Sequence, residues 1–380
     1  MSLTPLPFID LQAQRTRIGA SIDAGLLRVA AHGQYIMGPE VKTLEDDLKN
    51  FCGAKHCITV ANGTEALAMP LMAKHVRPGD AVLVPSFTFA ATAEVVAWLG
   101  ATPLFVDVDD NSFTMTLESL EAGIKKAKAL ALKPIAVIPV DLFGQAANYD
   151  EIENLAAAHG LWVMSDAAQS FGGAYQERKI GTIGHVTATS FFPSKPLGCY
   201  GDGGAIFTDD DEMAALLKSL RVHGQGHDKY DNVRIGLNAR LDTMQAAVLI
   251  EKLKILDDEI KARNEIAARY SSALADYVPV PYVAPENYSA WAQYTIRVPA
   301  QKRASLSAAL KEQGIPTMIY YPKPLHRQTA YRDFPVAGNG LPVSERLADE
   351  VLSLPMHPYL DMSSQDRIIT TLISVMKAMA

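Results

Sequence analysis

The sequence predicts an α/β protein with a large domain, built on a mostly parallel central sheet, and a smaller C-terminal α/β domain. Short apolar runs alternate with helical stretches between residues 81 and 208, which is typical of a parallel sheet with crossover helices. Most of these runs are continuous, as expected of strands covered on both faces. The chain of 380 residues is also too long for one ordinary core. We expect residues 1–250 to form the large domain and residues 251–380 the small one.

The first half of the chain supplies the elements of the predicted sheet. Six apolar, β-branched runs are expected as strands, at residues 81–84, 104–108, 135–140, 161–165, 186–192 and 205–208. Helical spacing is present at residues 18–29, 41–51, 64–74, 91–99, 117–127 and 149–159.

After Asp242 the pattern changes to one long helix, expected over residues 243–273 because apolar residues recur at spacings of three and four. A Pro-rich segment follows at 278–285. Beyond it we expect an alternating strand, a helix, a second strand and two terminal helices, the first three at 291–298, 304–313 and 316–320.

Composition excludes several classes of protein. The net charge of −7 argues against a general nucleic-acid binder. The N-terminal residues lack the pattern of a signal peptide, and no apolar run reaches the roughly 18 residues of a membrane span. Three cysteines without CxxC spacing favour reduced thiols over disulfides or a zinc site. We therefore expect a cytoplasmic protein without a metal.

A phosphate-binding turn is predicted at residues 61–67, ANGTEAL. Asn62 can cap a helix, and Glu65 follows three residues later as in a capping box. Gly63 and Thr64 would then lie in the first turn, where free N–H groups and the helix dipole favour a phosphate. A helix that is merely capped is the alternative.

A buried carboxylate is predicted in residues 162–170, WVMSDAAQS. Asp166 ends an apolar run, and burying it is unfavourable unless it meets a cation or hydrogen-bond donors. A protonated pyridine nitrogen is such a cation, and its ring can then accept electrons. Gln169 could donate to a phenolate oxygen of the same ring. Alternatively, Asp166 is a helix N-cap.

A single lysine stands in residues 189–205, TSFFPSKPLGCYGDGGA. Lys195 follows a strand that stops at Pro193, and desolvation there would expose an amine nucleophile suited to a Schiff base. Ser190 could reach a phosphate from the side opposite to Thr64. The alternatives are a solvated loop lysine and a small sheet residue.

Two later segments are candidate substrate contacts. The YYPKPLH segment at 320–326 could place Tyr321 and His326 in a pocket, or could be a Pro-rich connection. Residues 221–240 are locally basic and could meet an anionic substrate, although a solvated loop is the usual form of such a run. The cations concerned are Arg221, His223, Lys229, Arg234 and Arg240.

Together these motifs resemble those of the DegT/DnrJ/EryC1/StrS sugar aminotransferases, which are pyridoxal-phosphate (PLP) enzymes of fold type I. The similarity extends from residue 8 to residue 360. Its motifs are NGTEAL, PSFTFAATAEVV, PVDLFGQ, DAAQSFG, SFFPSKPLGCYGDGGA, LNARLDTMQAA and YYPKPLH.

The resemblance implies a cofactor role for individual residues of the large, PLP-binding domain. Lys195 would form the Schiff base, Asp166 would pair with the pyridine nitrogen, and Gln169 would contact the ring hydroxyl. Phe89 would stack on the ring. The phosphate would be held by Gly63, Thr64 and Ser190.

The resemblance also implies a homodimer with shared active sites, because Asn238 would reach the phosphate of the neighbouring subunit's cofactor. Within the family, SFFPSKPLGCYGDGG resembles members that aminate UDP-2-acetamido-2-deoxy-3-oxo-glucuronate for bacterial O-antigen, lipopolysaccharide or related glycans. The TTGEGG-like string of relatives acting at C4 is absent. Arg240 could grip the uronate carboxylate through two hydrogen bonds, with Tyr321 and His326 as further substrate residues.

The implied activity moves an amino group from glutamate to a keto nucleotide-sugar, with Lys195 as general base and acid and with ping-pong kinetics. Alternatives are an aminotransferase for another 3-keto or 4-keto NDP-hexose, a sugar dehydratase of the same fold, and a non-catalytic regulator. Dehydratases replace the lysine by histidine, so Lys195 and Gln169 argue against that class.

Overall fold

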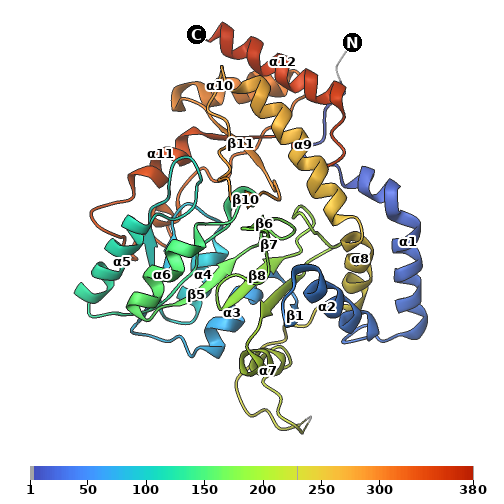
Figure 1. Ribbon diagram of the computed structural model, residues 1–380, viewed down its shortest axis with the longest axis vertical. Coiled ribbons are helices and arrows are strands. Elements are labelled where there is room, and N and C mark those ends of the chain that lie inside the picture. Colours follow the sequence, from blue (N-terminus) through green and yellow to red (C-terminus); the bar gives the residue numbers. More distant parts are fainter. Residues whose placement is uncertain (1–3, 229, 380) are drawn as a thin grey trace.

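The computed structural model describes residues 4–228 and 230–379 and confirms the α/β architecture (Figure 1). Its central sheet has seven strands in the order β1-β9-β8-β5-β4-β2-β3. In this sheet β9 runs antiparallel to both neighbours, and the other strands are parallel to one another. The strands are β1 (His56–Val60), β2 (Asp80–Pro85), β3 (Thr102–Val106), β4 (Lys133–Val137), β5 (Trp162–Asp166), β8 (Val186–Ser190) and β9 (Gly204–Thr208).

Helices cover the sheet on both faces, because consecutive residues along β2 and β9 are all buried. One group of helices consists of α3 (Gly63–Ala73), α4 (Ala91–Trp98) and α7 (Asp211–Leu220), which contact one another through α3. A second group pairs α5 (Leu117–Ala129) with α6 (Tyr149–His159). At the sheet edge beyond β1, α2 (Pro39–Cys52) and α1 (Leu11–His32) pack against α8 (Thr243–Leu253).

A second apolar core lies around a two-stranded sheet, β11 (Tyr294–Arg297) with β12 (Val351–Leu354). Three helices close this core near both chain termini, at the top of Figure 1: α9 (Leu256–Leu274), α10 (Ala300–Glu312) and α12 (Met362–Ala378). The remaining elements are β6 (Ala174–Tyr175), β7 (Arg178–Lys179), β10 (Asn287–Tyr288), α11 (Pro342–Glu350) and the 3-10 turns η1 (Leu142–Gly144) and η2 (Leu325–Arg327).

The single helix expected over residues 243–273 is wrong, because the structure divides it into α8 and α9 at Lys254 and Ile255. No glycine or proline causes the break. Instead, the two helices pack on different partners, α8 against α1 and α2, and α9 against α12. Of the strand expected at 316–320, the structure forms a single bridge, between Met318 and Ser353. The sequence analysis also did not predict β1 and α7.

The division into residues 1–250 and 251–380 stays a proposal. Helix α9 spans both cores, since Leu256 and Ile260 pack with large-domain residues, whereas Ile266 and later residues pack in the second core. The segment from Leu325 to Leu341 returns to the core of the central sheet. This return brings the YYPKPLH segment beside the ends of the strands.

Two further observations concern the described residues as a whole. All three cysteines are free and buried. No helix in residues 4–228 and 230–379 combines the length and the apolar character that crossing a membrane requires.

Candidate active site

A cavity of about 600 Å³ opens at the carboxyl ends of β5 and β8. Ligands of open α/β sheets bind at this edge, because side chains from several strand ends converge there. The cavity brings together most of the residues singled out from the sequence, namely Gly63, Thr64, Phe89, Asp166, Gln169, Ser190, Lys195 and Tyr321.

The anion-binding side of the cavity is the first turn of α3. Asn62 caps this helix, since its Oδ1 accepts a 2.8 Å hydrogen bond from the Glu65 backbone N–H. A Cβ built on Gly63 would lie 2.6 Å from the Cβ of Ser190, so only glycine lets the helix end approach β8 so closely. The Thr64 and Ser190 side chains therefore flank a helix N-terminus, where an anion is favoured.

The predicted capping box is only half formed. Asn62 makes its bond, but Oε2 of Glu65 is buried and has no hydrogen-bond partner among the described residues. Burial raises the pKa of Glu65, which also lines the cavity. Glu65 thus offers a polar group to the cavity as well as contributing to α3.

Asp166 is buried at the end of β5 and is held by two donors. The Thr92 hydroxyl donates to Oδ2 at 2.8 Å, and the Ala168 backbone N–H donates to Oδ1 at 3.3 Å. Burial raises the pKa of Asp166, while Thr92, Ala168 and the charge of Lys195 oppose this shift. The residues after Asp166 form turns and not a helix, so Asp166 is not a helix N-cap. Its carboxylate is available to a cation inside the cavity.

Lys195 lies in the cavity wall after β8, and its backbone N–H donates to the Phe192 carbonyl at 2.8 Å. Lys195 is half-buried and lines the cavity together with Asp166. Burial lowers the pKa of Lys195, and the charge of Asp166 partly offsets this effect. A lysine in this setting supplies a neutral amine more readily than a solvated one.

The amide of Gln169 is oriented by its neighbours. Its Oε1 accepts a 2.7 Å bond from the Phe143 backbone N–H, so Nε2 is left to donate toward the Tyr321 hydroxyl at 3.3 Å. Burial raises the pKa of Tyr321 well above its usual value, so the phenol stays protonated. Gln169 and Tyr321 together present N–H and O–H groups to the cavity.

Asn238 and Arg240 are not among the residues that line this cavity. Asn238 is exposed, and its Oδ1 accepts a hydrogen bond from the Arg240 guanidinium. Both flank Ala239, whose carbonyl accepts a 3.0 Å hydrogen bond from the Ala61 N–H, so the segment after α7 has returned to the end of β1 at this point.

Other cations of the basic stretch serve the fold of the chain. Arg221 is buried, forms an ion pair with Glu45 and donates to the Thr59 carbonyl at 2.9 Å. Arg234 donates to the Ser219 hydroxyl. These contacts use the guanidinium groups internally. Lys229 lies outside the described residues.

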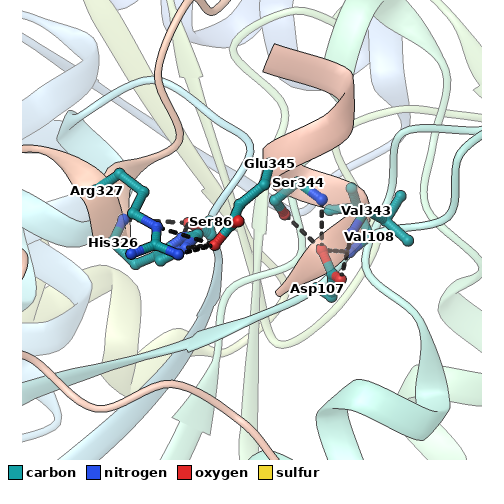
Figure 2. Close-up of polar contacts among 8 residues, drawn as sticks. All are labelled: Ser86, Asp107, Val108, His326, Arg327, Val343, Ser344 and Glu345. Carbon is teal, nitrogen blue, oxygen red and sulfur yellow. Dashed lines mark hydrogen bonds and ion pairs between the residues drawn. The ribbon is translucent and has the colours of Figure 1, made fainter. Parts of the chain in front are cut away.

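His326 is also placed outside the cavity lining, contrary to the expectation from its motif. Its Nδ1 lies 2.7 Å from the Ser86 hydroxyl and its Nε2 lies 3.0 Å from Glu345 Oε1, as Figure 2 shows. Both ring nitrogens are thus used within the protein. The His326 ring therefore links the end of β2 to α11. The first turn of α11 is also held by Asp107, whose carboxylate accepts hydrogen bonds from the backbone N–H groups of Val343 and Ser344 at 2.9 and 2.8 Å.

The sequence analysis missed two polar residues of the site. Thr92 is one of several small residues in FAATAEVV, and only the packing of α4 brings it to Asp166. Gln293 lines the cavity with a buried Oε1 that has no partner among the described residues. The one indication of Gln293 in the sequence is that it is a polar residue within an apolar run.

Comparisons with known proteins show what this chain is similar to. The model of the DegT/DnrJ/EryC1/StrS aminotransferase family matches residues 16–373. The UDP-2-acetamido-2-deoxy-3-oxo-D-glucuronate aminotransferase of Pseudomonas aeruginosa is 48% identical over 360 residues, covering 94% of this chain and 97% of the relative.

Solved structures show the same fold. A DegT DnrJ EryC1 StrS aminotransferase from Brucella abortus is 56% identical, with a TM-score of 0.95 and coverage of 97% of this chain and 98% of that one. The NtdA protein of Bacillus subtilis, crystallised with bound cofactor PMP, is 27% identical with a TM-score of 0.88, covering 99% of this chain and 86% of its own.

Proposed function

This chain belongs to the DegT/DnrJ/EryC1/StrS aminotransferase family, and we propose that it transfers an amino group from glutamate to the C3 ketone of UDP-2-acetamido-2-deoxy-3-oxo-glucuronate. The cofactor is pyridoxal phosphate, as in the family. The observation that supports the chemistry is the shared cavity of Lys195, Asp166 and the α3 N-terminus. The Pseudomonas relative supports the choice of acceptor sugar.

The residues present fit pyridoxal phosphate. The first turn of α3, with Thr64 and Ser190, suits the phosphate, and Asp166 suits the protonated ring nitrogen. Nε2 of Gln169, oriented by Phe143, is a donor for the ring oxygen. When bound, the cofactor supplies an aldehyde that an amine can join and a ring that takes up electrons.

Lys195 is the proposed acid–base group of the reaction. With the cofactor bound, Nζ of Lys195, whose pKa burial lowers, would take a proton from the amino-acid Cα and return it at C4′. Asp166 would stabilise the protonated ring nitrogen, and Thr92 holds the Asp166 carboxylate in its orientation. The Phe89 side chain, 57% exposed, would cover the ring from the open side of the cavity.

We further propose that Asn238 and Arg240 act in the site of a second copy of the chain, because they lie outside the cavity of their own chain. Asn238 would contact the phosphate and Arg240 the uronate carboxylate. This arrangement makes the active enzyme a homodimer. Its proposed setting is the cytoplasmic synthesis of a bacterial surface polysaccharide such as O-antigen or lipopolysaccharide.

Cofactor attachment is tested by borohydride reduction of purified enzyme, followed by peptide mapping. The phosphopyridoxyl label should be found on Lys195, and the Lys195→Ala variant should lose the visible absorbance of the wild type. A label on another lysine would contradict the assignment.

The acceptor is tested with a panel of keto sugars and glutamate, by measuring release of 2-oxoglutarate. The 3-keto UDP-uronate should have the highest kcat/KM, and Arg240→Ala should weaken its binding more than that of a neutral 3-keto UDP-hexose. Equal effects on both sugars would remove Arg240 from the carboxylate site.

The shared site has its own test, since mixing inactive Lys195→Ala subunits with Arg240→Ala subunits, which bind the 3-keto UDP-uronate weakly, should restore turnover at low concentrations of this sugar. A hybrid dimer then has one site with both wild-type residues. If unfolding and refolding the mixture restores nothing, each subunit has a complete site of its own.

A further inference from the structure

A second cavity, of about 20 Å³, lies behind the segment that carries Lys195. Lys195 belongs to the lining of both this cavity and the large one, so its chain segment is the wall between them. The residues of the wall are Pro193, Ser194, Lys195, Pro196 and Gly198. On the far side stand polar residues from three distant parts of the chain, which are Asp10, Gln14, Glu259, Arg263, His357 and Tyr359.

Part of this polar cluster is already hydrogen-bonded. Glu259 accepts from Gln14 Nε2 at 3.0 Å to each carboxylate oxygen, and also from the Tyr359 hydroxyl. Arg263, one turn further along α9, donates to the Trp291 carbonyl at 3.0 Å through Nη1. These bonds join α1, α9 and the segment before α12 into one rigid support.

Three buried nitrogens of the cluster have no hydrogen-bond partner among the residues that the structure describes. They are Nε of Arg263 and both ring nitrogens of His357. The residues are 4% and 2% exposed, so bulk water does not reach them. Unpaired buried polar groups are rare in native proteins, because each loses its hydration without compensation.

We infer that one water molecule is bound in this cavity, where it bridges Arg263 Nε to a ring nitrogen of His357 and supports the Lys195 wall. About 10–15 Å³ suffices for one water, which typically makes about three hydrogen bonds. Two of these go to Arg263 and His357. The third hydrogen bond of the water is left for the backbone of the Pro193–Gly198 wall. The prolines of this wall have no backbone N–H.

The charges of the cluster suit a water better than an ion. Burial, together with the nearby charge of Arg263, lowers the pKa of His357 to about 4, so the imidazole is neutral near pH 7. A neutral ring has one donor and one acceptor nitrogen. The Arg263 guanidinium faces the Glu259 carboxylate. Burial lowers the pKa of Arg263, and the charge of Glu259 is the largest of the influences that oppose this lowering.

Arg263 and His357 are accordingly positioning residues, since they act on Lys195 through the water and the wall. This role rests on the proposed function, whereas the water itself does not. Losing the bridge should let Lys195 move relative to Asp166 and weaken cofactor attachment. One lost hydrogen bond predicts an increase of about 3- to 10-fold in the dissociation constant for pyridoxal phosphate.

The first test is a high-resolution crystal structure of the wild-type protein. A water within hydrogen-bond distance of both Arg263 Nε and a His357 nitrogen is expected, and a cavity without that density would overturn the inference. This result depends on neither activity nor cofactor. A protein that holds the water but binds no pyridoxal phosphate would refute the proposed function and leave the water site established.

The second test compares the cofactor affinity of His357→Phe, His357→Gln and Ser353→Ala by titration of visible absorbance. Ser353 is buried in β12, and its hydroxyl pairs with Thr295 at 2.8 Å, so this control loses a buried bond at a residue that lines neither of the two cavities. His357→Phe should show the weakened binding, and His357→Gln should restore part of it. The positioning role is wrong if His357→Phe binds pyridoxal phosphate as tightly as Ser353→Ala does. If His357→Phe fails to fold, His357→Gln decides: wild-type affinity in a His357→Gln protein that has lost the water would also show that the role is wrong.

Discussion

The hydroxyl of Thr92 donates a 2.8 Å hydrogen bond to Oδ2 of Asp166, and both side chains are buried. The bond joins the first turn of α4 to the carboxyl end of β5. It leaves the carboxylate facing the cavity in one orientation. Thr92 is therefore a positioning residue for the group that meets the cofactor ring.

Replacing Thr92 by valine should lower kcat with little change of shape, because valine keeps the branched side chain and lacks the donor. A hydrogen bond to a charged group contributes about 1.5–3 kcal/mol, which corresponds to roughly a 10- to 100-fold loss. Single-turnover measurement with glutamate checks this. Thr92→Ser keeps the hydroxyl and should retain most of the rate; equal losses in both variants would show that shape and not donation matters.

Replacing Gly63 by alanine should weaken binding of pyridoxal phosphate, because the new Cβ would lie 2.6 Å from Ser190 Cβ and must push α3 away from β8. Such displacement would cost about 1–3 kcal/mol, which is on the order of a 10- to 100-fold loss of affinity. Equilibrium titration of the apoprotein measures it.

Gly25→Ala is the control for this change. Gly25 lies within α1. A Cβ built on it would have Ala247 Cβ of α8 as its nearest neighbour, at an ordinary distance of 3.5 Å. This variant should bind the cofactor as wild type does. Unchanged affinity in Gly63→Ala would mean that the close approach is not needed for the phosphate.

Replacing His326 by alanine should reduce the free energy of unfolding by about 1–3 kcal/mol, because the buried Ser86 hydroxyl loses the imidazole and keeps only the backbone N–H of residue 326. Arg327→Ala, which removes an exposed ion pair with the same Glu345, should cost less than about 1 kcal/mol. Denaturant unfolding compares the two. An increase in KM without loss of stability would instead support the original expectation that His326 meets the substrate.

His357 should make stability depend on pH between about 4 and 6.5. Its folded pKa of about 4 lies below the usual 6.5, so the unfolded chain binds more protons in this window and the free energy of unfolding rises with pH. Burial is the main cause, Arg263 adds to it, and Asp10 and Asp361 oppose it.

The contribution is at most about 3 kcal/mol across the window. Between pH 4 and pH 6.5 the free energy of unfolding should increase less in His357→Gln than in the wild-type protein, and the difference should be part of this amount. Thermal unfolding of both proteins across the window measures the difference. Parallel curves for the two proteins would show that His357 titrates normally in the folded state.

Much of the site was predictable because its signals are local. Continuous apolar runs mark strands covered on both faces, and chemically distinctive residues follow such runs directly, as Asp166 and Lys195 do. Asn62 and Gly63 indicate a capped helix within a few residues, and the structure confirms that cap. Parallel strands bring their carboxyl ends to one edge, so these residues meet without further information.

Contacts between distant segments were decided by tertiary packing alone. Thr92 is one small residue among several in the sequence, whereas His326 and Arg221 were candidate substrate contacts. Packing assigns these three residues to Asp166, Ser86 and Glu45. The break between α8 and α9 has no local cause, and the cavity behind Lys195 combines segments near residues 10, 195, 260 and 357. The physical reason is that a hydrogen bond or a cavity depends on the positions of both partners, and local sequence specifies only one of them.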